Sequence, residues 1–237
     1  MTKSILLIQH IANEPTDDFV SGWLRTQGCR LDLRFPSAGD DLPDSAGAEF
    51  DGVVNYGGTQ NCTEMDKYPF LQTEIDFTRD WIERGKSYLG FCLGGQIMSA
   101  ALGGTVSRRE DQRREVGYVM IEPTDEGKAS GFMAEAMPMF EWHQEQFSVP
   151  DSCELLATSQ ENFPHQAIAY GDKAFGFQFH PEVTTQLLKR WHRDAGDIYR
   201  GVAGADSQEK QIEDEAKYQP DVDRWLSAFL TNWLARL

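Results

Sequence analysis

The sequence has little of what marks a membrane, secreted or nucleic-acid-binding protein. No window comes close to roughly eighteen uninterrupted apolar residues, so we expect no membrane span. The N-terminus, MTKSILLIQHIANEP, has a short apolar stretch without a small-residue cleavage site, which is more typical of a first core strand than of a signal peptide. The 22 Lys and Arg residues are outnumbered by 38 Asp and Glu residues, and a net charge of −16 disfavours a nucleic-acid partner because phosphates would be repelled.

Cysteines and nucleotide-binding motifs are also scarce. Cys29, Cys62, Cys92 and Cys153 form no C-x-x-C pair and have no closely spaced histidines, which disfavours a zinc site. A chain of 237 residues can bury a real core without disulfides, so a reducing cytoplasm is the expected compartment. Neither a P-loop nor a G-x-G-x-x-G fingerprint occurs, so we expect no cofactor and no fused ATP-using domain.

What the first half does contain is an alternation of strand-like and helix-like segments. Apolar runs occur at residues 4–9, 50–58 and 87–92, and residues 30–35 alternate polar and apolar side chains like a strand. Helix-like segments lie between them, at 16–28, with Thr16 as the expected N-cap and Gly28 as the stop, and at 69–85. This βαβα order predicts an α/β fold, a doubly wound, mostly parallel, flavodoxin-like sheet with helices on both faces and sites at the carboxyl ends of its strands.

The second half differs in pattern. Residues 105–183 are predicted to be richer in short strands. From about Gly201 the sequence turns polar and acidic, as in a loop or exposed helix, before residues 221–237 repeat apolar side chains at the 3-4 spacing of an amphipathic helix. We expect one domain over residues 1–200 and a C-terminal helical extension over 201–237 that packs on the same domain; a homodimer or partner contact is the alternative for the helix.

Residues 86–104, KSYLGFCLGGQIMSAALGG, place a cysteine between an apolar run and a helix-like segment. Gly90 and Gly94 stand two positions before and after Cys92, where the turn of a nucleophile elbow has no room for side chains. Such a turn presents the thiol near a helix N-terminus, which favours the thiolate, and leaves the Leu93 amide free to bind an oxyanion. The pentad alone does not distinguish this elbow from an ordinary buried cysteine.

A cysteine nucleophile needs a base and a group that orients the base. The segment AFGFQFHPEV ends an alternating strand with His180-Pro181-Glu182. Two residues apart on extended backbone, the imidazole and the carboxylate point to the same side, so Glu182 would hold one ring nitrogen while the other faces the thiol. Three other histidines are expected in structural or exposed positions: His10, His165 and His192.

The segment GVVNYGGTQN has a glycine pair at the end of a predicted strand. Such a pair brings backbone amides close to a bound carbonyl, which makes Gly58 the candidate for a second oxyanion donor. The alternative is a simple turn.

Together, these three segments resemble the class I, or triad-type, glutamine amidotransferase family, and the resemblance runs from the first strand to about Val183. GFCLGGQ resembles the family's G-x-C-x-G-x-Q signature, and FQFHPE is similar to its His-x-Glu segment almost letter for letter. VNYGGT stands where the family has a glycine-containing oxyanion loop, with Thr59 in place of the commoner proline.

The resemblance implies a role for each matching position. Cys92 would be the nucleophile, His180 the general base and then acid, and Glu182 the orienting group. Oxyanion amides would come from Gly58 and Leu93. The residues implied to bind the substrate are Gln96 and, from the segment EWHQEQF, His143 and Glu145. The resemblance implies no metal and no cofactor.

The implied reaction is hydrolysis of the γ-amide of glutamine through a γ-glutamyl thioester, with release of ammonia and glutamate. A separate synthase partner would receive the ammonia. Two alternatives stay open: a γ-glutamyl peptidase acting on γ-glutamyl peptides or thiol conjugates, and a catalytically silent binding module of the same fold. The Cys-His-Glu set speaks against the silent module.

Residues 107–118, SRREDQRREVGY, concentrate positive charge in an acidic protein, through Arg108, Arg109, Arg113 and Arg114. The favoured interpretation is a solvated surface with neighbouring acidic partners. The alternative is a contact for an anionic acceptor or an acidic partner.

Overall fold

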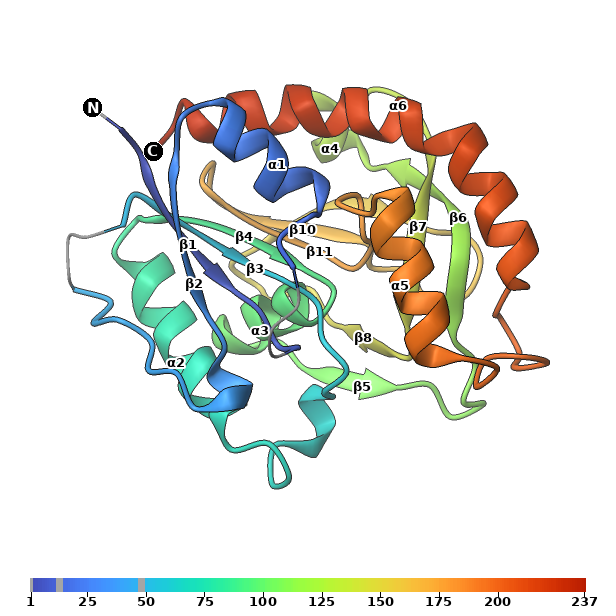
Figure 1. Ribbon diagram of the computed structural model, residues 1–237. Helices are drawn as coiled ribbons and strands as arrows, with labels where there is room; N and C mark the ends of the chain where they lie inside the picture. Colours follow the sequence, from blue (N-terminus) through green and yellow to red (C-terminus); the bar gives the residue numbers. More distant parts are fainter. Residues whose placement is uncertain (1, 12–14, 47–49) are drawn as a thin grey trace.

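The computed structural model describes residues 2–11, 15–46 and 50–237, and a nine-stranded sheet is its central element (Figure 1). The strands of this sheet, in chain order, are β1 (Ser4–Ile8), β2 (Arg30–Arg34), β3 (Gly52–Asn55), β4 (Ser87–Phe91), β6 (Glu115–Pro123), β7 (Met137–His143), β9 (Glu154–Thr158), β10 (Ala167–Tyr170) and β11 (Ala174–Phe177). In space their order is β2-β1-β3-β4-β11-β10-β9-β6-β7. A separate antiparallel pair joins β5 (Val106–Arg108) to β8 (Glu145–Phe147).

The large sheet has a parallel half and an antiparallel half. Strands β2, β1, β3, β4 and β11 pair in parallel, in the order expected of a flavodoxin-like sheet. The pairs from β11 through β10, β9 and β6 to β7 are antiparallel. The α/β fold class is therefore confirmed, and the antiparallel half accounts for the strand-rich pattern of residues 105–183.

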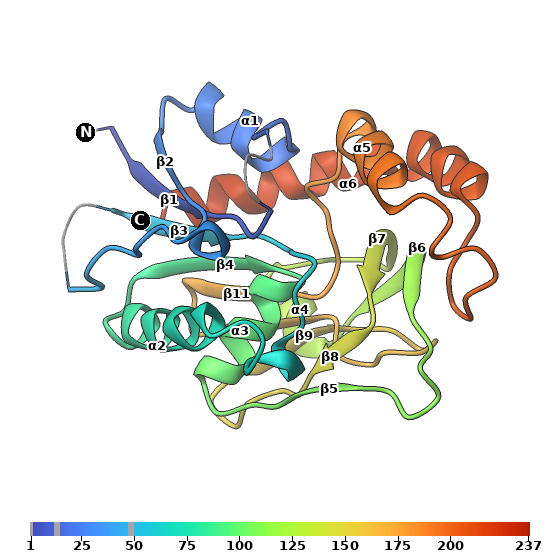
Figure 2. The same cartoon turned by 60° about the horizontal axis from the view of Figure 1, so that its bottom comes forward.

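Helices cover both faces of the sheet. The helices are α1 (Phe19–Thr26), α2 (Phe70–Glu83), α3 (Leu93–Ala101), α4 (Asp125–Ala129), α5 (Thr185–Ala195) and α6 (Gln208–Leu234), with short 3₁₀ turns η1 (Pro36–Ala38) and η2 (Cys62–Glu64). Helices α2 and α3 lie together on one face, whereas α1 and α6 lie on the other, with α5 beside α6 (Figures 1 and 2). β4 leads directly into α3, so the carboxyl end of a central strand meets a helix N-terminus.

The predicted start of the first helix is wrong by two residues. Asp18, and not Thr16, is the N-cap of α1, and its carboxylate accepts a hydrogen bond from the Ser21 amide at 2.8 Å. The predicted stop is correct: Gly28 follows the helix with φ of +77°, a left-handed conformation that glycine adopts readily. Gly85 ends α2 in the same way, with φ of +71°.

The C-terminal helix is longer than its apolar pattern predicts. Helix α6 joins the polar segment and the amphipathic segment into 27 residues and passes through Pro220, whose exposed position lets water reach the carbonyl that loses its donor. Its apolar stripe is buried in the main core, at Val222, Leu226, Phe229, Leu230 and Trp233. Lys3 hydrogen-bonds to the carbonyl of Leu237, so the two ends of the described chain meet.

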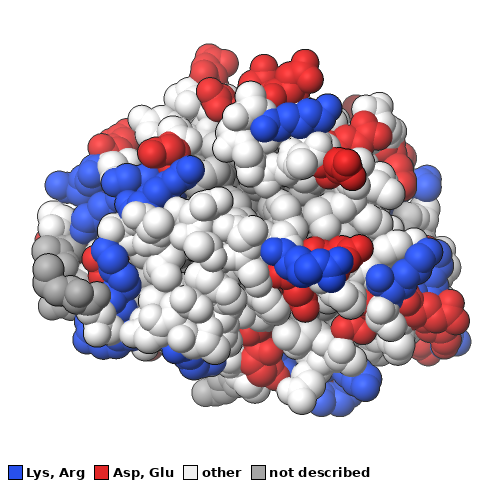
Figure 3. Space-filling model, turned by 90° about the horizontal axis from the view of Figure 1, so that it is seen from above, with Lys and Arg blue, Asp and Glu red and all other residues white. Residues whose placement is uncertain are grey.

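Charge is spread over the face on which α1 and α6 lie. Figure 3 shows lysine and arginine side chains beside aspartates and glutamates, with uncharged side chains between them. The net charge of −16 therefore does not gather into one acidic field on this face. Among the described residues, no helix combines the length and hydrophobicity that a bilayer span requires.

Candidate functional site

The Cys92 turn joins β4 to α3. Cys92 has φ of +48° and ψ of −104°, a strained backbone conformation for a residue other than glycine. It is the N-cap of α3, yet its side chain does not cap the helix, so the thiol is free to face away from the helix amides. The residue is 6% exposed. The turn thus holds a nearly buried sulfur at the positive end of a helix.

The glycines around Cys92 are required by close backbone packing. A Cβ on Gly90 would lie 2.4 Å from the Gly94 carbonyl oxygen, and a Cβ on Gly94 would lie 2.1 Å from the Asn55 carbonyl oxygen. Both distances are far shorter than any real carbon–oxygen contact. The positions of these two glycines therefore follow from the close backbone packing of the turn, as the sequence predicted.

His180 and Glu182 lie beside this turn. His180 Nδ1 and Glu182 Oε1 are 2.8 Å apart, and both side chains are nearly buried. Burial alone would lower the pKa of His180, but the Glu182 carboxylate and the Cys92 sulfur outweigh it and raise that pKa well above its ordinary value. The geometry therefore favours a protonated imidazole next to the sulfur.

Gln178 is a neighbour of the sulfur that sequence reasoning missed. Its amide nitrogen donates to Cys92 Sγ at 3.7 Å, and its amide oxygen accepts from Gln96 at 3.4 Å. Gln178 precedes His180 by two positions. On extended backbone this spacing places both side chains on the same side, as it does for His180 and Glu182, so the spacing could have identified Gln178 as a neighbour of the sulfur. The thiol itself lies 4.0 Å from the carbonyl oxygen of Trp142.

One cavity of about 280 Å³, here called the polar cavity, brings most of the predicted site residues together. Its lining includes all of the following: Gly58, Asn61, Cys92, Leu93, Gln96, Arg114, His143, Gln144 and Glu145. His180 and Glu182 line an adjoining cavity, described below. Segments more than eighty residues apart in the chain thus meet around the sulfur.

The predicted binding residues differ in how they face the polar cavity. The Gln96 amide donates to the carbonyl of Glu145 at 3.2 Å, so it also ties α3 to β8. The Glu145 carboxylate is 2% exposed, hydrogen-bonds to Thr63 and pairs with Arg108 at 3.2 Å. The Glu145 carboxylate therefore already balances the positive charge of Arg108 in the wall of the polar cavity.

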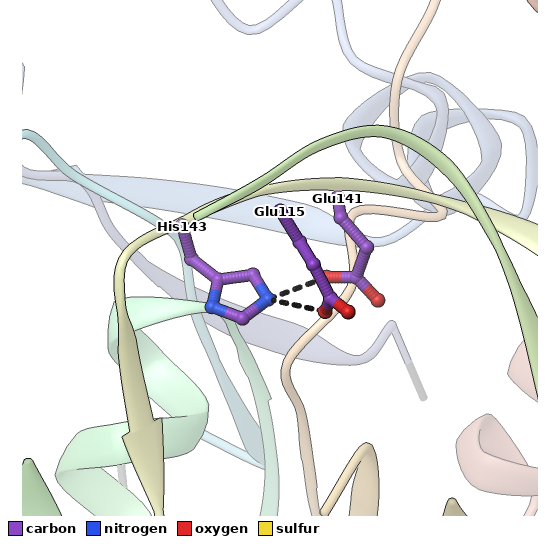
Figure 4. A group of neighbouring side chains, drawn as sticks. All are labelled: Glu115, Glu141 and His143. Carbon is purple, nitrogen blue, oxygen red and sulfur yellow. Dashed lines mark hydrogen bonds and ion pairs between the residues drawn. The ribbon is translucent and has the colours of Figure 1, made fainter. Parts of the chain in front are cut away.

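His143 belongs to a buried charged cluster (Figure 4). Its Nε2 lies 3.2 Å from carboxylate oxygens of both Glu115 and Glu141, while its Nδ1 lies 2.8 Å from the Glu145 carbonyl oxygen. Burial would lower the pKa of His143, but the two carboxylates raise it to about 10. Burial raises the pKa of Glu141 to about 7 against the opposing pull of His143. An imidazolium shared by two glutamates explains the cluster, so we propose no metal there.

A third buried histidine, His10, packs against the Gly57-Gly58 pair. His10 Nε2 lies 2.9 Å from Glu74 Oε2, and His10 Nδ1 lies 3.2 Å from the Gly57 carbonyl oxygen. A Cβ on Gly58 would lie 2.5 Å from the His10 Cβ, and a Cβ on Gly57 would lie 2.7 Å from His180 Cε1. Both glycines are thus needed for close approach, one to His10 and the other to His180. Sequence reasoning found no acidic partner for His10, because Glu74 lies in a distant helix.

The arginine-rich segment splits between two environments. Arg109 pairs with Asp111 at 2.7 Å, in agreement with the predicted surface pairing. Arg108 pairs with Glu64 and Glu145, and Arg114 lines the polar cavity with its guanidinium 5.2 Å from the centre of the Tyr199 ring. Part of the segment therefore borders the site.

Comparisons with known proteins identify the family of this chain. A sequence model of the family "Glutamine amidotransferase class-I" matches residues 24–192. The glutamine amidotransferase-like protein YfeJ of Salmonella typhimurium is 28% identical over 173 residues, which cover 70% of this chain and 71% of that protein. A subunit of the glutamine-hydrolyzing GMP synthase of Sulfolobus acidocaldarius is 33% identical over 138 residues, which cover 57% of this chain and 69% of that subunit.

Solved structures extend the likeness to almost the whole chain. A glutamine amidotransferase from Thermotoga maritima is 26% identical and superimposes with a TM-score of 0.86, covering 98% of each chain. A glutamine amidotransferase from Methylobacillus flagellatus, at 24% identity, has the same fold with a TM-score of 0.88 over 100% of this chain and 96% of its own. The chain therefore belongs to the class I glutamine amidotransferase family.

Proposed function

We propose that this protein hydrolyses the γ-amide of glutamine, or of a closely related γ-glutamyl compound, with Cys92 as the nucleophile. The observation that carries the proposal is the strained Cys92 turn, with φ of +48°, beside a buried imidazole–carboxylate pair whose nitrogen and oxygen are 2.8 Å apart. A strained turn is retained where function requires it, and here it supports a thiol at a helix N-terminus.

In the first step the Cys92 thiolate attacks the γ-carbonyl carbon of the substrate. The carbon–nitrogen bond then breaks, and the proton on His180 passes to the leaving nitrogen, so that ammonia departs and a γ-glutamyl thioester remains. Glu182 stabilises the imidazolium before this transfer and fixes the ring through Nδ1, as a positioning residue.

In the second step His180, now neutral, takes a proton from water as that water attacks the thioester. The carbon–sulfur bond breaks, glutamate leaves with loss of a proton to solvent, and the Cys92 thiolate beside a protonated His180 is restored. Negative charge develops on the carbonyl oxygen in both steps. We assign its stabilisation to the backbone amides of Leu93 and Gly58, because one begins α3 and the other borders the same cavity.

The polar cavity offers a site for the amino-acid end of the substrate. The Arg114 guanidinium supplies a positive charge for the α-carboxylate, and the buried Glu145, whose carboxylate is paired with Arg108, forms part of the wall. Gln96 and His143 hold this wall in place through the Glu145 carbonyl. We propose Arg114 in addition to the residues that the resemblance implied.

Two further parts of the proposal concern organisation. We propose that residues 1–200 form the catalytic domain and that residues 201–237 are its helical extension. The relative named as a subunit of a glutamine-hydrolyzing GMP synthase supports an ammonia acceptor on a separate polypeptide.

The test is release of glutamate and ammonia from glutamine by purified wild-type protein and by Cys92→Ala. We expect activity in the wild type and none in Cys92→Ala, with unchanged circular dichroism. Cys153→Ala is the matched control, since Cys153 is a free cysteine outside both cavities. Turnover that survives in Cys92→Ala would refute the proposal.

A further inference from the structure

A second and larger cavity adjoins the catalytic residues. This aromatic cavity has a volume of about 450 Å³ and is lined by Tyr56, Trp142, Leu187, Trp191, Ile198 and Tyr199, as well as by His180 and Glu182. Trp191 packs edge-on against His180 with ring centres 5.0 Å apart, and Trp142 packs edge-on against Trp191 and Tyr199 at 5.6 and 5.2 Å. A continuous aromatic wall therefore starts at the imidazole.

The two cavities share part of their walls, and each is lined by one of the reacting side chains. Cys92 and Gln96 line the polar cavity, whereas His180 and Glu182 line the aromatic one. Five residues line both: Gly58, Thr59, Trp142, Ile198 and Tyr199. A γ-glutamyl amide with its carbonyl carbon at the sulfur would place its glutamyl part in the polar cavity and its nitrogen toward His180, at the entrance to the aromatic cavity.

Glutamine leaves this second cavity empty. Its leaving group is ammonia, a single heavy atom, whereas the aromatic cavity falls within the range of about 300–1,000 Å³ that small-molecule sites occupy. We propose that the aromatic cavity is a leaving-group subsite, and that the preferred substrates are γ-glutamyl amides of amines with an aromatic or bulky apolar body. This inference rests on the proposed function, because it requires the same thioester chemistry.

The charges around the cavity favour an amine over an amino acid as the leaving group. Asp18 lines the cavity and is 6% exposed, and its Oδ2 has no hydrogen-bond partner within the described residues. Asp194 and Glu182 also line the cavity, but Asp194 pairs with Arg193 and Glu182 with His180. Asp18 is therefore the carboxylate of this lining without a cationic partner among the described residues. Arg190 is a second cation of the lining besides His180, and Asp17 already holds it through two 2.8 Å hydrogen bonds. A carboxylate on the leaving group would therefore meet more negative than unbalanced positive charge.

The chemistry balances without a co-reactant. His180 gives its proton to the amine nitrogen as the carbon–nitrogen bond breaks, so the amine leaves neutral and gains a proton from solvent, while water hydrolyses the thioester. The aromatic wall gains contact with the amine's body in the transition state as well as in the ground state. The binding free energy from these contacts is therefore expected to raise kcat/KM.

The experiment compares four substrates on wild-type protein: glutamine, γ-glutamylmethylamide, γ-glutamyl-2-phenylethylamide and γ-glutamylphenylalanine. The last two differ only by one carboxylate on the leaving group. We expect kcat/KM for the phenylethylamide to exceed that for the methylamide by about tenfold or more, and to exceed that for γ-glutamylphenylalanine by about tenfold.

A variant that fills the subsite gives an independent measurement. Ala195 ends α5 and lines the aromatic cavity, and Ala129, the control, ends α4 on the surface away from it. Ala195→Phe should lower the ratio of kcat/KM for the phenylethylamide to that for glutamine about tenfold, whereas Ala129→Phe should leave this ratio unchanged.

The outcomes separate the two proposals. Equal kcat/KM values for all amides, or a ratio that Ala195→Phe does not change, would overturn the subsite while Cys92-dependent glutamate release still supports the proposed function. A preference for γ-glutamylphenylalanine would also overturn it, in favour of a peptidase. Cleavage of none of the four substrates, or cleavage that survives Cys92→Ala, would remove the proposed function and the subsite together.

Discussion

Two histidines of this protein are buried against glutamates, and they differ in what else they touch. His180 has one carboxylate partner, Glu182, and faces the Cys92 sulfur and a cavity. His143 has two, Glu115 and Glu141, and its other ring nitrogen is tied to the Glu145 backbone. In both, neighbouring carboxylates outweigh burial and raise the imidazole pKa.

The difference teaches that a buried histidine–carboxylate pair does not by itself indicate catalysis. Both nitrogens of His143 are bonded to protein groups, so neither is left to exchange a proton with a substrate. At His180, Nδ1 is held and the remaining nitrogen is directed to the sulfur, which leaves one proton to transfer. We therefore assign chemistry to His180 and support of the site to His143.

The largest expected effect comes from removing His180, to which we assign the proton transfer. His180→Gln should lower kcat for glutamate release by about 10³-fold or more, because neither thiolate formation nor protonation of the leaving nitrogen is then assisted. Steady-state kinetics on glutamine measures this, with thermal unfolding to confirm a folded variant. His143→Gln is the matched variant: a loss of kcat as large as that of His180→Gln, in a folded protein, would contradict the distinction.

Glu182→Gln should reduce kcat by about 10²- to 10⁴-fold, as the loss of an orienting carboxylate does in other triads. Without Glu182, burial dominates, so the pKa of His180 falls and the imidazole loses its proton at lower pH. The alkaline limb of the kcat/KM profile should therefore move to lower pH. An unchanged profile would show that Glu182 does not act on His180.

His143→Gln should act mainly on stability. It leaves Glu115 and Glu141 buried without their shared cation, which costs about 3–5 kcal/mol of the free energy of unfolding. Chemical denaturation measures this value against wild-type protein. Replacing the half-buried His165 by Gln is the control, with an expected change below about 1 kcal/mol. A fully stable His143→Gln would refute the ion-pair description.

The smallest expected effect concerns pH and Glu141. Because burial raises the pKa of this carboxyl from 4.5 to about 7, the folded state binds the proton more tightly than the unfolded chain. The stabilisation that this proton binding gives the folded state is fully present below about pH 4.5 and is lost as the pH rises through about 7. His143, with a pKa raised to about 10, adds a loss between about pH 6.5 and 10.

Glu141→Gln imitates the protonated carboxyl and should remove the first of these losses. We expect the melting temperature of wild-type protein to fall relative to Glu141→Gln by roughly 5 °C between about pH 5 and 8. Glu154→Gln, at an exposed position of β9, is the control. Parallel curves for wild type and Glu141→Gln would mean that Glu141 carries its charge throughout this range.

Much of the fold and the centre of the site could be predicted because they depend on residues close together in the chain. The alternation of apolar runs and amphipathic segments predicts the parallel half of the sheet. Gly90 and Gly94 predict the Cys92 turn, since backbone contacts within that turn and with Asn55 leave no room for a Cβ. The two-residue spacing of His180 and Glu182 predicts their contact.

Other features were decided only by tertiary contacts. The N-cap of α1 is Asp18 and not Thr16, and Asp18 also accepts a hydrogen bond from Tyr56, a residue of another segment. Glu74 reaches His10, and Gln178 reaches the sulfur, across spans of 64 and 86 residues.

By itself, the sequence determined the family, the fold class and the Cys92 turn with its neighbouring His180–Glu182 pair, to which we assign the chemistry, because turn chemistry, strand alternation and helix periodicity act between neighbours. Only the tertiary structure decided which buried histidine faces the Cys92 sulfur, that α6 continues through Pro220, and that an aromatic cavity adjoins His180. These features depend on burial and on charge pairs between distant segments. Local sequence patterns do not specify such contacts, because their free energy arises when the chain packs.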